Sequence, residues 1–288
     1  MKNTMLIDTH CHLNFSAYKD DFDDVVKRTL DAGMRIINPG SQNTTSKRAI
    51  DLAQKYPGKM FAAVALHPIH LHETYVDEVE IPFKSREENF DPAYYDSLAQ
   101  EKGVVAIGEC GIDYFHVPEG VEEVEFKNKQ KEVFLKHIEL ASKRNLPMIL
   151  HCRPSKQEPQ GAYRDMFAIL QHAGYSRGVV HCFISDVEIA RMFLEAGFMI
   201  SFTGIITFPN AKSLLDVVKF VPLDRLMVET DAPYLAPQQF RGKRNEPLYV
   251  KYVAEKVAEV KGVGYEDIER QTTANAIRFF NLDAGNPS

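Results

Sequence analysis

The chain has 288 residues, of which 44% are hydrophobic and 26% charged, and its formal net charge is −6. This composition excludes an intrinsically disordered protein, and the acidic balance excludes one that coats nucleic acid through a global positive field. No signal-peptide core opens the chain, and no run approaches the roughly 18 apolar residues of a membrane span, so we expect a cytoplasmic protein without a membrane partner.

Eight apolar, β-rich runs recur along the chain, with segments of helical character between them. The runs are residues 5–11, 34–41, 60–68, 103–113, 147–153, 177–183, 198–204 and 225–235. Strands that are apolar throughout and alternate with helices are typical of a parallel sheet covered on both faces. Eight such units predict an α/β protein, a TIM-type (β/α)8 barrel that occupies residues 1–288 as a single domain. The alternative is a doubly wound sheet, but the first strand–helix turn has no glycine-rich dinucleotide fingerprint.

Three of the intervening segments carry a clear helical pattern. Apolar residues recur at helical spacing in residues 22–33, and Gly33 supplies a stop signal. Residues 125–145 repeat the pattern, with His137 on the inner, packed stripe. In residues 185–197, Ser185 is the expected N-cap.

A long polar segment, residues 68–92, follows the third run and includes a second H-x-H pair, His70 and His72. Loops of this length are usually functional or disordered. We consider two interpretations, a lid over the barrel mouth and a mobile excursion, and we expect both histidines to lie on the surface.

Histidines and carboxylates lie toward the C-terminal ends of five of the eight runs. His10 and His12 lie at the end of the first, and Glu109, His151, His181 and Asp231 lie in the C-terminal halves of the other four. In a (β/α)8 barrel the C-terminal ends of the strands carry the active site. Residues i and i+2 of a strand point the same way, so the H-x-H pair predicts a bidentate metal clamp. Six such groups buried at one end would be costly without a cation that compensates them.

Six ligands exceed the three protein ligands of an open mononuclear zinc site and favour two divalent ions. We expect one ion on His10, His12 and Asp231, the other on His151 and His181, and Glu109 as a bridge between them. Imidazole and carboxylate ligands without thiolate admit zinc, manganese, iron or magnesium. The free cysteines Cys11, Cys110, Cys152 and Cys182 form no C-x-x-C pair and are predicted to pack away from the ligands.

These residues lie in motifs that resemble the TatD family of metal-dependent hydrolases. The motifs "DTHCHL", "LHP", "GECGIDY", "LHCR", "VVHCF", "VETDAPYL" and "RGKRNEP" stand in the family's order. The resemblance implies a TIM-type barrel and a divalent-metal-dependent deoxyribonuclease; some relatives are associated with removing D-amino acids from tRNA. It puts the six residues above on metal-ligand positions and His67 and Arg153 near the substrate phosphate. Ala65 departs from the glycine of many relatives.

Phosphodiester hydrolysis requires a proton acceptor and groups that bind phosphate. We predict Asp231 and Glu109 as catalytic residues, with Asp231 accepting the proton of the attacking water; pure ligation is its alternative role. Arg153 and His67 are candidate phosphate contacts, against a structural ion pair and a turn-stabilising hydrogen bond. The basic residues Arg241, Lys243 and Arg244 are further candidates, against a solvated charge run.

The sequence leaves three functions open. The first is a two-metal deoxyribonuclease that acts on single strands or strand ends, with DNA as a transient partner and no obligate protein partner. The second is a D-aminoacyl-tRNA deacylase or another amidohydrolase-type enzyme for small substrates. The third is a noncatalytic metal-binding scaffold, which is disfavoured because no proposed ligand is missing.

Overall fold

The computed structural model describes residues 6–73, 75–76 and 83–282. In this part of the chain, a parallel sheet runs in the order β1-β2-β3-β6-β7-β8-β9-β10. Its strands are β1 (Ile7–Asp8), β2 (Arg35–Pro39), β3 (Met60–Val64), β6 (Val104–Asp113), β7 (Met148–Arg153), β8 (Gly178–Val180), β9 (Met199–Phe202) and β10 (Leu226–Val228). Each predicted run contains one of them, and the predicted (β/α)8 barrel is confirmed.

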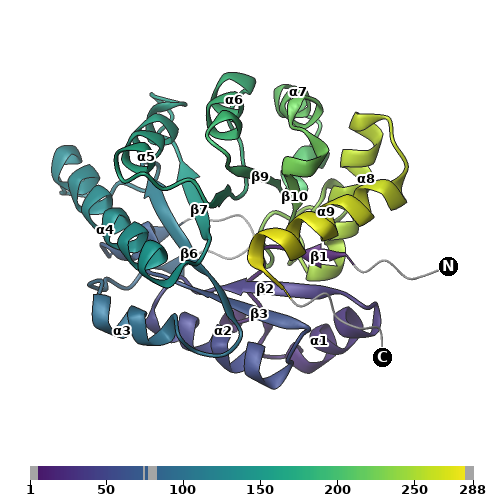
Figure 1. Ribbon diagram of the computed structural model, residues 1–288, viewed down its shortest axis with the longest axis horizontal. Helices are drawn as coiled ribbons and strands as arrows, with labels where there is room; N and C mark the ends of the chain where they lie inside the picture. Colours follow the sequence, from purple (N-terminus) through teal and green to yellow (C-terminus); the bar gives the residue numbers. More distant parts are fainter. Residues whose placement is uncertain (1–5, 74, 77–82, 283–288) are drawn as a thin grey trace.

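Helices surround the strands on the outside (Figure 1). They are α1 (Phe22–Asp31), α2 (Asn43–Lys55), α3 (Pro92–Leu98), α4 (Glu123–Arg144), α5 (Gly161–His172), α6 (Val187–Glu195), α7 (Lys212–Phe220), α8 (Val250–Lys261) and α9 (Tyr265–Phe280). None of the described helices is long and apolar enough to cross a bilayer. The expected cap of α6 is wrong by one residue, because Asp186, not Ser185, accepts the backbone N–H of Ile189 at 3.0 Å.

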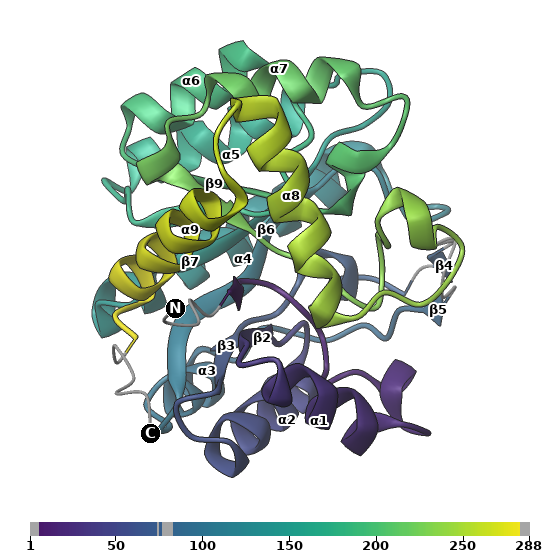
Figure 2. The ribbon, with the colours of Figure 1, turned by 90° about the vertical axis from the view of Figure 1, so that its right-hand side faces the viewer.

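The barrel interior is filled by inward-pointing side chains from all eight strands. Ile37, Ile149 and Met227 belong to this inner cluster, and Ala276 and Phe280 of α9 close it at one end. Bulky apolar residues in this position make the barrel a packed core and leave the opposite end for chemistry. Figure 2 shows α9 and the short β4–β5 hairpin (Tyr75–Val76, Phe83–Lys84) at opposite ends of the molecule.

The barrel closes just beyond the ends of its first and last strands. The backbone N–H of Asp231 donates to His10 O at 2.8 Å, and that of His12 donates to Ala232 O at 2.6 Å. Cys11 and Ala232 form an isolated parallel bridge at the same point. The backbone seam that joins the two edges of the sheet therefore carries three of the predicted metal ligands.

Candidate metal centre

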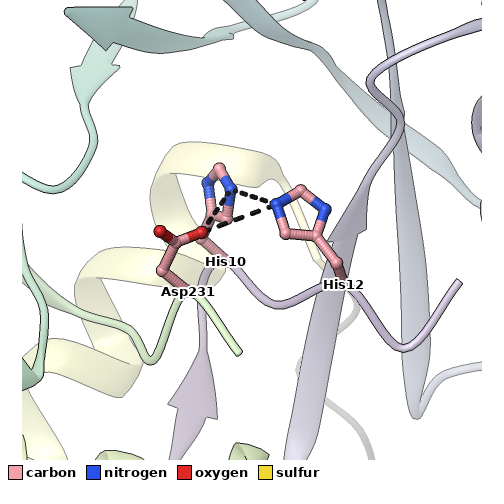
Figure 3. Close-up of side chains that lie close together, drawn as sticks. All are labelled: His10, His12 and Asp231. Carbon is pink, nitrogen blue, oxygen red and sulfur yellow. Dashed lines mark hydrogen bonds and ion pairs between the residues drawn. The ribbon is translucent and has the colours of Figure 1, made fainter. Parts of the chain in front are cut away.

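The first ligand group lies on this seam. β1 ends at Asp8, so His10 and His12 follow the strand, although the sequence places them within it. Their side chains still converge, with the two Nε2 atoms 3.1 Å apart. Asp231 Oδ1 lies 3.5 Å from both of these nitrogens (Figure 3).

Glu109 links this group to a second one. Its Oε2 lies 3.2 Å from His10 Nε2 and 3.5 Å from His12 Nε2. Its Oε1 lies 2.9 Å from His151 Nδ1 and 2.8 Å from His181 Nε2. One carboxylate thus faces a histidine pair with each of its oxygens, and the structure brings all six predicted ligands together.

An irregularity in β6 turns Glu109 toward the cluster. The pairing of β6 with β7 shifts register between Ile107 and Cys110, which adds a residue on the β6 side. Gly111, with φ of 150°, also lies against β7, and a Cβ there would lie 2.0 Å from His151 O. The glycines of the "GECG" motif allow this close approach of the two strands.

Three of the four histidines are held by a hydrogen bond on the ring nitrogen that faces away from the cluster. His12 Nδ1 lies 3.1 Å from Pro39 O, His181 Nδ1 lies 3.2 Å from Glu229 Oε1, and His151 Nε2 lies 3.3 Å from Asp113 Oδ2. Such bonds fix the tautomer and direct the other nitrogen toward a metal.

Glu229 and Asp113 are buried site residues that the sequence analysis missed. The signal was present, because Glu229 lies two residues before the predicted ligand Asp231, and Asp113 lies four residues after the predicted ligand Glu109. In a run predicted as a strand, an even spacing keeps side chains on one face.

The electrostatics of the cluster favour ionised carboxylates. Burial opposes ionisation of Glu109, but the charge of the neighbouring His181 holds its pKa well below the usual range. Burial also opposes ionisation of Asp231, and the hydrogen bond from His12 lowers its pKa nonetheless. Burial alone would lower the pKa of His12, but its hydrogen bonds to the two carboxylates raise it to about 9. A cation that binds His12 therefore displaces a proton.

These residues fit a divalent metal. Two imidazole nitrogens face the same carboxylate oxygens, and hydrogen bonds satisfy only some of these nitrogen–oxygen contacts. No thiolate belongs to this cluster of ligands. Three groups of side chains have ligand atoms close enough to hold an ion: His10, His12 and Asp231; His10, His181 and Glu229; and His67, Glu109 and His151. The third group brings in His67, which the sequence analysis assigned to substrate.

A cavity of about 510 Å³ opens above the cluster, with His12, Glu109, His151, His181 and Asp231 in its lining. His10 is fully buried beneath it. The acidic residues that the described part of the chain contributes to the lining are Glu109, Asp113 and Asp231.

Comparison with known proteins decides the family. The model of the family described as TatD related DNase matches residues 7–281. The chain belongs to this TatD family. It is 40% identical to the uncharacterized metal-dependent hydrolase YabD of Bacillus subtilis, over 97% of this chain and 100% of that protein. It is 32% identical to a protein of Erwinia billingiae named 3'-5' ssDNA/RNA exonuclease TatD, over 97% and 100% of the two chains.

Solved structures agree with this placement. The TatD homologue YJJV of Escherichia coli superposes with a TM-score of 0.81 at 27% identity, covering 96% of this chain and 98% of that one. A phosphotriesterase homology protein from Escherichia coli shares the fold, with a TM-score of 0.63 at 14% identity over 97% and 100% of the two chains. We therefore place the chain among the metal-dependent hydrolases of the TatD family.

The candidate phosphate contacts of this TatD protein separate into two groups. His67 and Arg153 line the cavity. His67 Nδ1 accepts the Ile69 N–H at 3.1 Å, which is the turn-stabilising hydrogen bond considered as the alternative to phosphate binding. His67 Nε2 lies 3.3 Å from Glu109 Oε1. Burial and the neighbouring His151 lower the pKa of His67 to about 4, so the ring is neutral with its proton on Nε2. The Arg153 guanidinium stacks on the Phe115 ring at 4.2 Å.

The basic residues after β10 lie differently. Arg241, Lys243 and Arg244 are not among the described residues that line the cavity. Arg244 binds Asp21 through two contacts of 2.7 and 2.6 Å, and Arg241 stacks on Phe208 at 4.5 Å. The structure thus gives Arg244 an ion pair with the start of α1.

Two further expectations are wrong. Cys182 does not pack outward, because its backbone has φ of 45° and the residue joins the cavity lining. His70 does not lie on the surface; it is 6% exposed, and burial together with the neighbouring His67 lowers its pKa to about 3. Ile69, His70, Lys84 and Arg86 of segment 68–92 line the cavity, so the described part of this segment forms a wall. Residues 74 and 77–82 of the predicted lid lie outside the described residues.

Proposed function

We propose that this protein is a divalent-metal-dependent phosphodiesterase that cleaves DNA at strand ends or in single strands. Support comes from the charge distribution in the cavity. Among the described residues, the acidic ones in the lining all belong to the candidate metal centre or contact it, whereas the other charged ones are the cations Arg48, Lys84, Arg86 and Arg153. In a chain of net charge −6, this cavity suits an anionic substrate.

Two ions are proposed, one held by His10, His12 and Asp231, and the other by His151 and His181, with Glu109 between them. When bound, zinc, magnesium or manganese ions supply Lewis acidity toward phosphoryl oxygens and lower the pKa of water. The chain's own groups position the substrate. Arg153 lies where a bidentate contact would orient the phosphate, and the Nε2–H of His67 is a donor of fixed position.

Asp231 is the proposed proton acceptor. Its side chain is 15% exposed, so it reaches the cavity, and its lowered pKa keeps it ionised at neutral pH. Only one of its oxygens, Oδ1, is close to His10 and His12. The carboxylate can therefore contact the ligand histidines and face an attacking water at the same time.

The test is a chelation and reconstitution experiment. Protein stripped of metal is reloaded with zinc, magnesium or manganese and incubated separately with labelled single-stranded DNA, duplex DNA and D-aminoacyl-tRNA. We expect metal-restored cleavage of single-stranded DNA, and none by Asp231→Asn with the same ion. Release of the D-amino acid without DNA cleavage, or full turnover in metal-free protein, overturns the proposal.

A further inference from the structure

Three cations gather on the side of the cavity that follows β2 and β3. Arg48 comes from α2, while Lys84 and Arg86 come from β5 and the residues after it, and all three side chains are exposed. We propose that they form a subsite for the phosphate of a nucleotide next to the scissile bond. The inference rests on the proposed function and deepens it, because it names the residues that hold a phosphate of the DNA outside the metal centre.

The segment that carries Lys84 and Arg86 is anchored so that both side chains point to the same side. Ser85 between them is 2% exposed, and its hydroxyl donates to His72 O at 2.8 Å. Three residues after Ser85, the Glu88 N–H donates to His70 O at 2.8 Å. Alternation of exposed and buried residues places the two cations on one face, just as alternation pairs side chains along a strand.

Helix α2 completes the subsite. The Gln42 side-chain amide at its start donates to Arg86 O at 3.1 Å, and the Arg86 guanidinium lies 3.5 Å from Thr44 Oγ1. Arg48 is one turn further along the helix than Thr44 and therefore lies on the same face. Gln42, Thr44 and Thr45 also line the cavity, so hydroxyl and amide groups accompany the three cations.

Three carboxylates near these cations in the described part of the chain are engaged elsewhere or only weakly. Glu88 accepts the Asn43 N–H at 3.2 Å and the Tyr95 hydroxyl at 2.9 Å, and Glu87 pairs with Lys129 at 3.0 Å. Lys84 pairs with Glu73, but their side chains are 65% and 58% exposed. A surface ion pair of this kind is weak and exchanges readily for a phosphate.

The opposite side of the cavity has a different character. Ile184, Ile205, Tyr234 and Leu235, which follow β8, β9 and β10, line it there. In the strand order, β8 and β9 lie across the barrel from β2 and β3. A polynucleotide has phosphates on one edge and bases and sugars on the other, and apolar or aromatic side chains receive bases without sequence preference. The two sides of the cavity match these two edges.

The subsite is tested by DNA binding without turnover. Binding of a fluorescein-labelled single-stranded oligonucleotide is measured by anisotropy in EDTA over a range of salt concentrations. Lys84→Gln/Arg86→Gln is compared with the wild type and with Lys47→Gln/Lys55→Gln. The control removes two exposed cations of α2 that are not in the cavity lining.

For single strands, the slope of log K against log salt decreases by about 0.7 for each phosphate that the protein no longer neutralises. We expect the slope of Lys84→Gln/Arg86→Gln to be smaller by about 1.4 and its affinity at low salt to be at least about tenfold weaker. The control keeps the wild-type slope. Thermal unfolding of both variants verifies folding, since all four side chains are exposed.

The two proposals fail in different ways. Equal slopes for the two double variants, or a wild type that does not bind the oligonucleotide, overturn the subsite whether or not DNA is cleaved. A reduced slope in Lys84→Gln/Arg86→Gln, together with metal-loaded wild type that cleaves no DNA, keeps the subsite and overturns the proposed function.

Discussion

The floor and the wall of the cavity are built from different parts of the chain. The floor is the cluster of six candidate metal ligands, which lie at or just beyond the ends of the barrel strands. In three of its histidines, a hydrogen bond with Pro39, Glu229 or Asp113 fixes the ring nitrogen that faces away from the cluster. The basic wall comes from α2 and the segment after β3, with exposed side chains. The floor is therefore rigid and suited to the reaction, whereas the wall is suited to the choice of substrate.

A large effect is expected from Glu109→Gln on the floor. This substitution keeps the size of the side chain but removes the charge that faces both histidine pairs. Breaking a buried charge interaction costs about 3–5 kcal/mol, so we expect kcat/KM to fall by roughly a thousandfold. Elemental analysis of the purified variant should also find less bound metal than in the wild type.

Glu255→Gln, on the exposed side of α8, is the matched control for the loss of one carboxylate and should retain wild-type metal content and turnover. Full turnover by Glu109→Gln would contradict the view that the floor works as one unit.

A smaller effect is expected from Glu229→Gln, which changes the support of a ligand. Glu229 Oε1 accepts from His181 Nδ1 at 3.2 Å and from the Cys182 N–H at 2.7 Å. A glutamine keeps one acceptor but loses the charge that orients the ring. We expect metal affinity to weaken by about 10- to 100-fold, measured by competition with a chromogenic chelator.

Asp113→Asn makes the equivalent change at His151 and should weaken affinity to a similar extent. Wild-type affinity in both variants would mean that the buried carboxylates serve folding and not the metal.

The sequence predicted most of the floor and little of the wall. Eight regularly placed apolar runs were enough for the barrel, because alternating strands and helices have few other ways to bury them. The convergence of His10 with Asp231 followed from that barrel, since their runs become neighbours only when the sheet closes. Glu109 was predicted at the correct end, although the added residue in β6 that turns it inward was not.

Tertiary contacts decided the remaining features. His70 is buried because segment 68–92 folds back on itself, which no local pattern indicates. Arg244 finds Asp21, a partner more than 200 positions away in the chain, and a run of basic residues carries no information about that choice. Glu229 was overlooked because Asp231 was considered as the functional carboxylate of its run, without the acidic residue two positions before it.

A buried histidine of α4 supports the chain that leads from β3 into the basic wall. This contact predicts that the stability of the protein depends on pH. His137 Nε2 accepts the Leu66 N–H at 3.0 Å, and Nδ1 donates to Val133 O at 2.8 Å, so α4 holds the chain just after β3. Burial lowers the pKa of His137 from 6.5 to about 4. The unfolded chain therefore binds a proton first as the pH falls, and this part of the stability is present above about pH 6.5 and is lost on the way down to about pH 4.

We expect His137→Gln to remove this dependence. Between pH 6.5 and about pH 5, the free energy of unfolding of the wild type should fall by about 1.5 kcal/mol more than that of the variant. Urea unfolding at both values measures the difference between the two slopes. The variant is less stable overall, but parallel pH profiles would show that His137 is not the titrating group.

The smallest effect is expected from Arg244→Gln. This variant tests whether the basic wall extends to the segment after β10. Arg244 binds Asp21 and donates to Ala17 O at 2.9 Å, and its guanidinium lies 4.5 Å from the centre of the Tyr18 ring. Both members of the ion pair are partly exposed, so its loss should lower the free energy of unfolding by about 1 kcal/mol. Denaturant titration measures this change, while KM for an oligonucleotide measures contact with substrate. A raised KM at unchanged stability would extend the wall to the segment after β10; a stability loss at unchanged KM restricts it to the cations that line the cavity.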